Sequence, residues 1–153
     1  MRSRARIAVV ASAAFLSGCG VDVVVADRKV NQLCEKDGGI KVFVRDSPPA
    51  ELLKSDGMID LDALTYPKTP QKYYLERTRL DIQTSDPHIF RSELRLVRRI
   101  DNRLLGIAVV YYRAAQNQGL PFLARASHRC PDINGPAHLV QAVFYTSSEM
   151  PKQ

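Results

Sequence analysis

Apolar and charged positions alternate most clearly in the second half of the chain. Across residues 92–100 the period is two, which is typical of a β-strand with one buried face. One face carries Leu94, Leu96 and Ile100, and the other carries Glu93, Arg95 and Arg99. Residues 73–82 alternate less completely, and residues 104–113 are rich in valine and tyrosine. With a turn at residues 101–103, these segments predict antiparallel strands. A helix over residues 93–105 also fits the spacing, but the nearby β-branched residues favour strands.

The spacing changes near the start of the chain. Val30, Leu33 and Cys34 recur at i, i+3 and i+4, which predicts a helix that begins at Asp27 as its N-cap. Glycines at positions 38 and 39 end this helix, since glycine is favoured just past a helix C-terminus.

The remaining segments complete an α+β fold. Residues 20–26 are expected to form a short tether or a first strand, and residues 40–45 a strand. Residues 49–72 form a long irregular connection with a short helix at residues 50–54. Residues 135–145 favour a helix, although a strand also fits. We therefore expect an antiparallel sheet packed by an N-terminal helix, with a possible short C-terminal helix.

Residues 1–18 have the three parts of a secretory signal peptide. Arg2, Arg4 and Arg6 are basic, residues 7–16 are apolar, and Ser17-Gly18 offers small side chains for cleavage. The apolar run is shorter than the roughly 20 residues that a membrane-spanning helix needs. A buried N-terminal helix is the alternative, but a segment with three arginines and no acid argues against it.

The segment Leu16-Ser17-Gly18-Cys19 resembles the lipobox of bacterial lipoproteins. The resemblance implies that the Cys19 thiol receives a diacylglycerol and that Cys19 becomes the first residue after cleavage. Gly20 stands where an aspartate favours inner-membrane retention in such lipoproteins, so we expect the periplasmic face of the outer membrane. The predicted organisation is a signal peptide at 1–18, a lipidated N-terminus and tether at 19–26, and a single periplasmic domain at 27–150.

The signal peptide accounts for much of the positive charge. The 153 residues include 22 basic and 16 acidic ones, a formal net charge of +6. Three of the 22 basic residues lie within residues 1–18, so the mature chain has 19 basic and 16 acidic residues, a net charge of +3. Such a small excess does not indicate a nucleic-acid partner.

Two cysteines remain once Cys19 is assigned to lipidation. In an oxidising compartment, Cys34 and Cys130 are expected to form a disulfide. A metal site that adds His128, Asp132 and His138 to Cys130 is the alternative, but this spacing is unlike that of structural zinc sites. We expect neither a metal nor another cofactor.

Residues 31–42 begin Asn-Gln-Leu-Cys-Glu-Lys-Asp-Gly-Gly-Ile, a run similar to one in a group of small proteobacterial lipoproteins without an assigned activity. The strand end at Tyr112-Arg113 and the later Ser-His-Arg-Cys-Pro run, residues 127–131, extend the similarity. In that group a late cysteine also precedes a proline, which supports the pairing of Cys34 with Cys130. Ala114-Ala115 departs from the glycine pair that the resemblance leads us to expect.

Motifs for catalysis are missing from the sequence. It contains no G-x-S-x-G elbow, P-loop, G-x-G-x-x-G run or H-E-x-x-H helix. The three histidines, His88, His128 and His138, have no partner close in sequence that would tune them as general bases.

Arginine is concentrated in the central strands, and Arg91, Arg95 and Arg99 are the candidates for an anion-facing surface. Lipid headgroups, lipopolysaccharide phosphates or an acidic envelope protein would be the anion. A solvated face neutralised by neighbouring acids is the simpler interpretation.

The sequence thus predicts a lipid-anchored binding or structural module rather than an enzyme. The alternatives are a small envelope hydrolase, and an inhibitor or exclusion factor that acts on an envelope protein.

Overall fold

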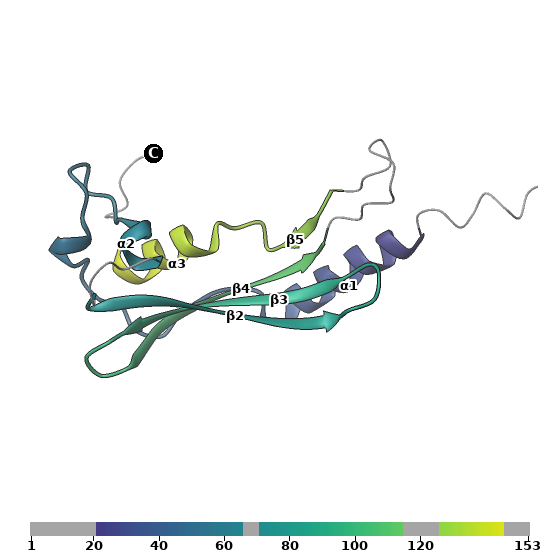
Figure 1. Cartoon of the computed structure of the whole chain (residues 1–153), viewed down its shortest axis with the longest axis horizontal. Helices are drawn as coiled ribbons and strands as arrows, with labels where there is room; N and C mark the ends of the chain where they lie inside the picture. Colours follow the sequence, from purple (N-terminus) through teal and green to yellow (C-terminus); the bar gives the residue numbers. More distant parts are fainter. Residues whose placement is uncertain (1–20, 66–70, 115–125, 146–153) are drawn as a thin grey trace, which may run out of the picture.

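The computed structural model describes residues 21–65, 71–114 and 126–145 and confirms the α+β class. Its elements include three α-helices, one short 3-10 helix and five strands. In chain order they are α1 (Val21–Asp37), β1 (Gly39–Val42), η1 (Ala50–Leu52), α2 (Leu61–Thr65), β2 (Tyr73–Gln83), β3 (Ile89–Arg98), β4 (Arg103–Arg113), β5 (His128–Cys130) and α3 (Gly135–Phe144). In Figure 1, α2 and α3 lie together at one end of the long sheet, and α1 lies at the other end.

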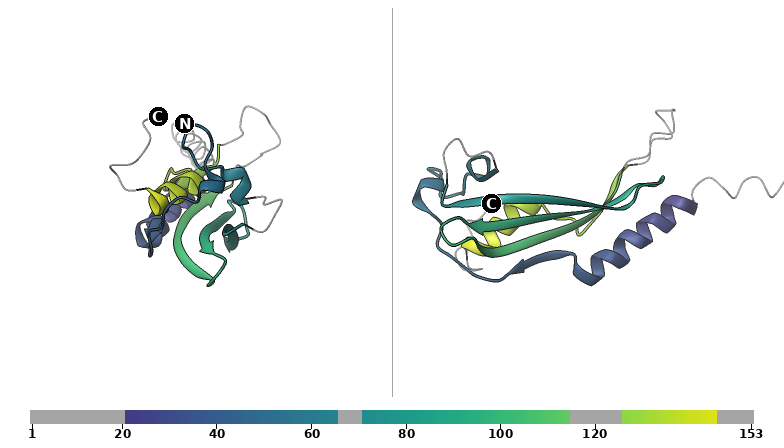
Figure 2. Two further views of the ribbon diagram at one scale, coloured as in Figure 1. Left: turned by 90° about the vertical axis from the view of Figure 1, so that its left-hand side faces the viewer. Right: turned by 60° about the horizontal axis from the view of Figure 1, so that its bottom comes forward.

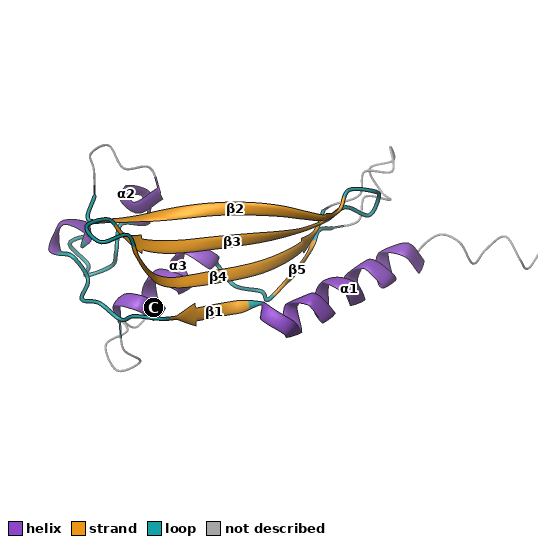
Figure 3. Cartoon of the chain, turned by 90° about the horizontal axis from the view of Figure 1, so that it is seen from below, coloured by secondary structure: helices purple, strands orange, loops and turns teal. Residues whose placement is uncertain are grey.

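All strand pairs in the sheet are antiparallel, and β4 is its centre. The order is β1-β4-β3-β2, while β5 also pairs with β4. Gly39 of β1 lies opposite Val109, and Cys130 of β5 lies opposite Tyr111. Two short strands from distant parts of the chain therefore share one edge of β4, as Figure 3 shows.

Alternate side chains of β4 reach two separate apolar clusters. Ala108 packs with Leu139 and other residues of α3, whereas Val109 packs with Val30 of α1. Because successive side chains of a strand point to opposite faces, α1 and α3 cover opposite faces of the sheet. The sheet between them is twisted along its length (Figure 2).

The C-terminal segment is a helix, which settles the choice left open by its sequence. A Cβ atom on Gly106 would lie 3.1 Å from side-chain atoms of Leu139 and of Val143, so the glycine lets α3 approach β4 closely. At the end of α3, Phe144 packs edge-on against Tyr73, with ring centroids 5.1 Å apart. These contacts close the larger of the two clusters.

The N-terminal helix begins at Val21, so the prediction of a tether or strand over residues 20–26 is wrong for residues 21–26. The run of three valines favours a strand by propensity, but Val23 and Ala26 continue the buried stripe of Val30 and Cys34. Packing on the sheet outweighs the local preference. Asp27 consequently lies inside the helix and does not cap it.

Strand boundaries differ from the sequence pattern at both ends of β3. The strand starts at Ile89, earlier than predicted, and ends at Arg98, so Ile100 falls in the turn and is 84% exposed. A register shift between Leu96 and Val97 interrupts the alternation there. The turn itself is confirmed, and Asn102 adopts a positive φ of 50°, a conformation that asparagine tolerates.

The predicted disulfide is confirmed. Cys34 near the end of α1 is bonded to Cys130 of β5, with Cα atoms 5.7 Å apart. A Cβ atom on Gly38 would lie 2.9 Å from the Cys34 sulfur and 2.7 Å from its carbonyl oxygen, so only glycine fits beside the disulfide. Gly39, with φ at 108°, then turns the chain into β1.

Among the described residues, no helix is long and apolar enough to cross a membrane. The predicted signal peptide, residues 1–18, and the predicted lipidation site, Cys19, lie outside the described residues.

We expect the free energy of unfolding of the double variant Cys34→Ala, Cys130→Ala to be about 2–4 kcal/mol lower than that of wild type. The reason is that the disulfide closes a long loop and so restricts the unfolded chain. Urea unfolding followed by circular dichroism measures the loss. Peptide mapping of the non-reduced wild type should recover Cys34 and Cys130 in one linked species. Recovery of both cysteines as free thiols would contradict the structure.

Candidate functional site

Arg91, the first of the predicted anion-facing residues, lies on the α1 side of the sheet and is held by carboxylates. Its Nη2 lies 2.7 Å from Glu93 Oε2 and 3.3 Å from Asp37 Oδ2. The Tyr111 hydroxyl donates to the other Asp37 oxygen at 2.6 Å. Burial, and then this hydrogen bond, raise the pKa of Tyr111, so it stays protonated at neutral pH. The group joins the end of α1 to β3 and β4.

Arg95 and Arg99 are more open. Arg95 shares the face of Arg91 and lies 3.4 Å from Glu76 Oε2 and 3.8 Å from Glu93 Oε1, with 39% of its side chain exposed. Arg99 lies in the turn after β3, where it stacks over the Tyr74 ring at 4.8 Å. Its Nε also donates to the Gln71 carbonyl oxygen.

The structure therefore brings Arg91 and Arg95 together around Glu93 and places Arg99 beyond the strand end. Around the two strand arginines lie three carboxylates, those of Asp37, Glu76 and Glu93. An anion that bound here would have to compete with these carboxylates. The surface is a neutralised charge network, and the anion-facing role of the three arginines stays a prediction.

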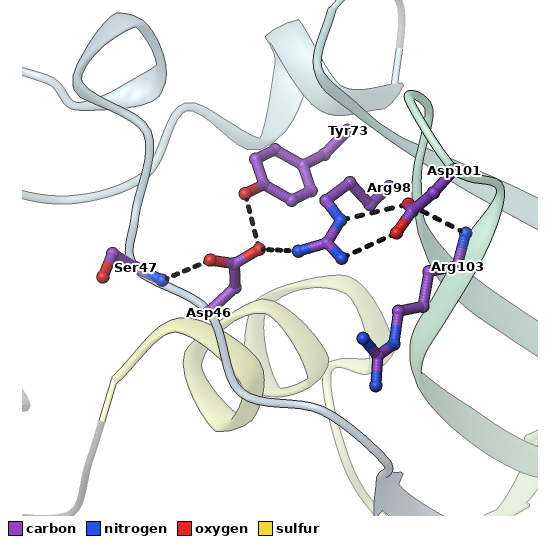
Figure 4. Close-up of polar contacts among 6 residues, drawn as sticks. All are labelled: Asp46, Ser47, Tyr73, Arg98, Asp101 and Arg103. Carbon is purple, nitrogen blue, oxygen red and sulfur yellow. Dashed lines mark hydrogen bonds and ion pairs between the residues drawn. The ribbon is translucent and has the colours of Figure 1, made fainter.

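A second network, which the sequence did not single out, is centred on Asp46 (Figure 4). Asp46 Oδ2 accepts hydrogen bonds from the Tyr73 hydroxyl at 2.8 Å and from Arg98 Nη1 at 2.9 Å. Arg98 also binds Asp101 through two nitrogens, at 3.1 and 2.7 Å. The network joins the segment after β1 to the start of β2, the end of β3 and the following turn.

Electrostatics keep this network charged and paired at neutral pH. Partial burial opposes ionisation of Asp46, but hydrogen bonds from Tyr73, Ser47 and Arg98 outweigh it and lower the pKa. The hydrogen bond from Arg98 lowers the pKa of Asp101 to about 2. Burial and the bond to Asp46 raise the pKa of Tyr73. None of these groups is set to exchange a proton near pH 7, so the network crosslinks the fold and is not an acid–base site.

Asp46 also borders an open hollow of about 390 Å³, lined by residues 45–48 and by Val143, Phe144 and Tyr145. Arg45, the cation of this hollow, donates to the carbonyl oxygens of Ala142 and Tyr145 at 3.0 Å each. These bonds satisfy the C-terminal end of α3. Among the described residues that line the hollow, both charged groups are thus used within the fold.

One histidine does meet a carboxylate. His88 Nε2 lies 3.0 Å from Asp81 Oδ1, and Arg79 Nε lies 3.0 Å from the same oxygen. The hairpin of β2 and β3 makes this contact, so strand register was the signal that could have revealed it. The side chains are 29% and 46% exposed, and His88 lines neither the hollow beside Asp46 nor a second of about 30 Å³ near Met58. The pair lies on an open surface.

The other histidines serve as local polar contacts. His128 Nε2 lies 2.9 Å from Asn31 Oδ1 of α1, and His138 Nδ1 accepts from the Asn134 backbone N–H at 3.1 Å. Within the part of the chain that the structure describes, no group of three or more histidine, cysteine, aspartate or glutamate side chains is placed to hold a metal ion.

Arg113 is the buried charged residue of the described core, only 3% exposed. Its guanidinium donates to Asp27 Oδ1 of α1, to the Ala114 carbonyl oxygen at 3.2 Å and to the Ala126 carbonyl oxygen at 2.9 Å. A buried arginine needs such partners, because an unpaired charge in the interior is costly. Arg113 therefore acts as a structural link between α1, β4 and the segment before β5.

Comparisons with models of protein families, with curated proteins and with solved structures find no match to this chain.

The Asp46 network predicts a pH-dependent stability. We expect Asp46→Asn to lower the free energy of unfolding at pH 7 by about 1–2 kcal/mol, because charge-assisted hydrogen bonds are lost. Because the pKa of Asp46 is lowered in the folded protein, its ionised carboxylate stabilises the fold fully above its unfolded pKa of about 4, and this effect is lost as the pH falls below that value through the lower pKa of the folded state. Urea unfolding should show the difference from wild type shrinking across that window. The exposed Glu51→Gln serves as the control and should change stability little at either pH.

The anion-facing role of the arginines can be tested separately. It requires that Arg95→Glu combined with Arg99→Glu abolish retention of the domain on vesicles with anionic headgroups. Lys54→Glu combined with Arg77→Glu, both at exposed positions away from this face, makes the same change in charge and should leave retention unchanged. Equal retention of wild type and the Arg95, Arg99 variant would exclude the role.

Proposed function

We propose that this chain is a lipid-anchored envelope protein whose periplasmic domain is a non-enzymatic binding or structural module. Acyl chains on Cys19 would hold it at the periplasmic face of the outer membrane. The observation that carries the proposal is the segment Leu16-Ser17-Gly18-Cys19, which follows a basic and apolar leader and directly precedes the folded domain. Two or three acyl chains on one residue suffice for stable anchoring, whereas a single chain does not.

The disulfide supports an exported location. Disulfides persist in oxidising compartments such as the bacterial periplasm and are rare in the cytosol. Cys34 and Cys130 come from segments 96 residues apart in the sequence and lie in bonded geometry. Cys19 is then the cysteine left for another use, consistent with lipidation.

The side-chain chemistry supports a module without catalysis. Carboxylates form ion pairs with three arginines of the domain, Arg91, Arg98 and Arg113. The carboxylate of Asp46 already accepts hydrogen bonds from side chains of the fold. A hydrolase that forms a covalent intermediate would need a nucleophile beside a general base. The contacts of the His88–Asp81 pair are with Arg79 and Phe90, and neither supplies one.

Replacement of the predicted acylation site tests the anchor. We expect Cys19→Ala to leave an unprocessed precursor without incorporated fatty acid, because the thiol that would carry the diacylglycerol is gone. Metabolic labelling with a radioactive fatty acid and intact-mass analysis measure both effects. The matched control is Cys34→Ala combined with Cys130→Ala, which removes thiols from the domain and should still be acylated. Normal cleavage and acylation of the Cys19 variant would refute the proposal.

Capture of partners then narrows the role of the domain. A tagged mature protein that recovers one stoichiometric envelope protein indicates a binding module or an inhibitor. Purification of the domain alone indicates a structural role at the membrane surface.

A further inference from the structure

The first turns of α1 expose an unusual set of apolar side chains. Val21, Val24 and Val25 are 57%, 60% and 57% exposed. They stand at i, i+3 and i+4, so they lie side by side on one face of the helix. The opposite face of the same turns, Val23 and Ala26, is buried against the domain. We call the three exposed residues the valine patch.

The valine patch lies at the extremity of the molecule. In Figures 1 and 3 the N-terminal end of α1 points away from the sheet and reaches past the ends of the strands. Farther along the helix the exposed positions become polar or charged, as at Arg28 and Gln32. The outward face of α1 therefore changes from apolar to polar with distance from its N-terminus.

The position of the patch in the chain identifies what covers it. Val21 follows Cys19 by two residues, and two residues of extended chain span at most about 7 Å. If Cys19 carries acyl chains, its sulfur lies at the bilayer surface and Val21 cannot lie far from that surface. The patch is then beside the lipid at all times.

The size of the patch argues against a protein partner as its main occupant. A stable interface buries roughly 800 Å² on each partner. Three partly exposed valines at the tip of one helix supply only a small part of such an area. An anchored helix needs no such area, because the acyl chains already supply the affinity.

We infer that the valine patch inserts into the interfacial layer of the bilayer, so that the N-terminal turns of α1 form a second membrane contact beside the acyl chains. This inference rests on the proposed acylation of Cys19. Val21, Val24 and Val25 enter the boundary between headgroups and acyl chains, and Arg28, one turn farther on the same face, lies at the level of the phosphates. Gln32, a further turn away, stays in water.

A single tryptophan can report this insertion, because the chain contains none. We would reconstitute the acylated mature Val24→Trp protein into phosphatidylcholine vesicles that contain phosphatidylglycerol, with and without bromine atoms on the acyl chains. The expected result is emission shifted to the blue and a loss of intensity with brominated lipid. Gln32→Trp, on the same face, is the control and should keep the emission of a water-exposed indole and little quenching.

A second variant separates the effect of the patch from the affinity of tryptophan itself for membranes. In the Val24→Trp protein, Val21→Ser combined with Val25→Ser should move the emission back to the red and reduce the quenching. Circular dichroism of each variant confirms that α1 and the domain remain folded.

The outcomes distinguish this inference from the proposed function. An intact mass without acyl chains would overturn both. If the protein is acylated but the indole of Val24→Trp is no more quenched than that of Gln32→Trp, the membrane contact alone is overturned. A blue shift that grows with protein concentration, without quenching by brominated lipid, would assign the patch to contact with a second copy. That result would also overturn the membrane contact.

Discussion

The structure depends on the seam between α1 and strands β4 and β5, where the helix packs on one face of the sheet. Four contacts follow one another along the helix at intervals of about one turn: Asp27 with Arg113, Asn31 with His128, Cys34 with Cys130, and Asp37 with Tyr111. Their partners all belong to β4 and β5. One side of the helix is thus held from its second turn to its C-terminal end by an ion pair, a hydrogen bond between an amide and a histidine, a disulfide, and a hydrogen bond from a phenol to a carboxylate.

The seam also determines how the sheet is completed. The edge of β4 is covered by β1, which follows α1 directly, and by β5, which comes from about 90 residues later in the chain. The disulfide lies where these two short strands meet. Because neither strand is long enough to be stable alone, the covalent link and the helix hold both in register. Gly38 is part of the same arrangement, since a larger residue would collide with the disulfide.

Sequence patterns predicted the elements better than their connections. Alternation identified β2 and β3, the valine and tyrosine content identified β4, and cysteine counting identified the disulfide, because all three depend on local or compositional rules. The start of α1 could not be predicted in the same way. The valines at positions 23–25 favour a strand locally, and only the packing of Val23 and Ala26 on the sheet reveals the helix.

The polar networks could not be predicted from the sequence for a similar reason. Asp46 and Arg98 are separated by 52 positions, and His88 meets Asp81 only because of the hairpin register. Such pairs depend on the register of several strands together. The proposed anchor differs in this respect, because its evidence is a short run of residues that can be recognised without the fold.

The outer edge of β2 has a consequence for the behaviour of the molecule at high local concentration. β2 is 11 residues long and is the last strand on its side of the described sheet, so its backbone could recruit a strand from another chain. Its charged side chains, among them Arg77 and Arg79, and the irregular register near Asp81 make such pairing unfavourable. If copies are concentrated on one membrane, as the proposed anchor implies, they meet often, and these features of β2 oppose their association edge to edge.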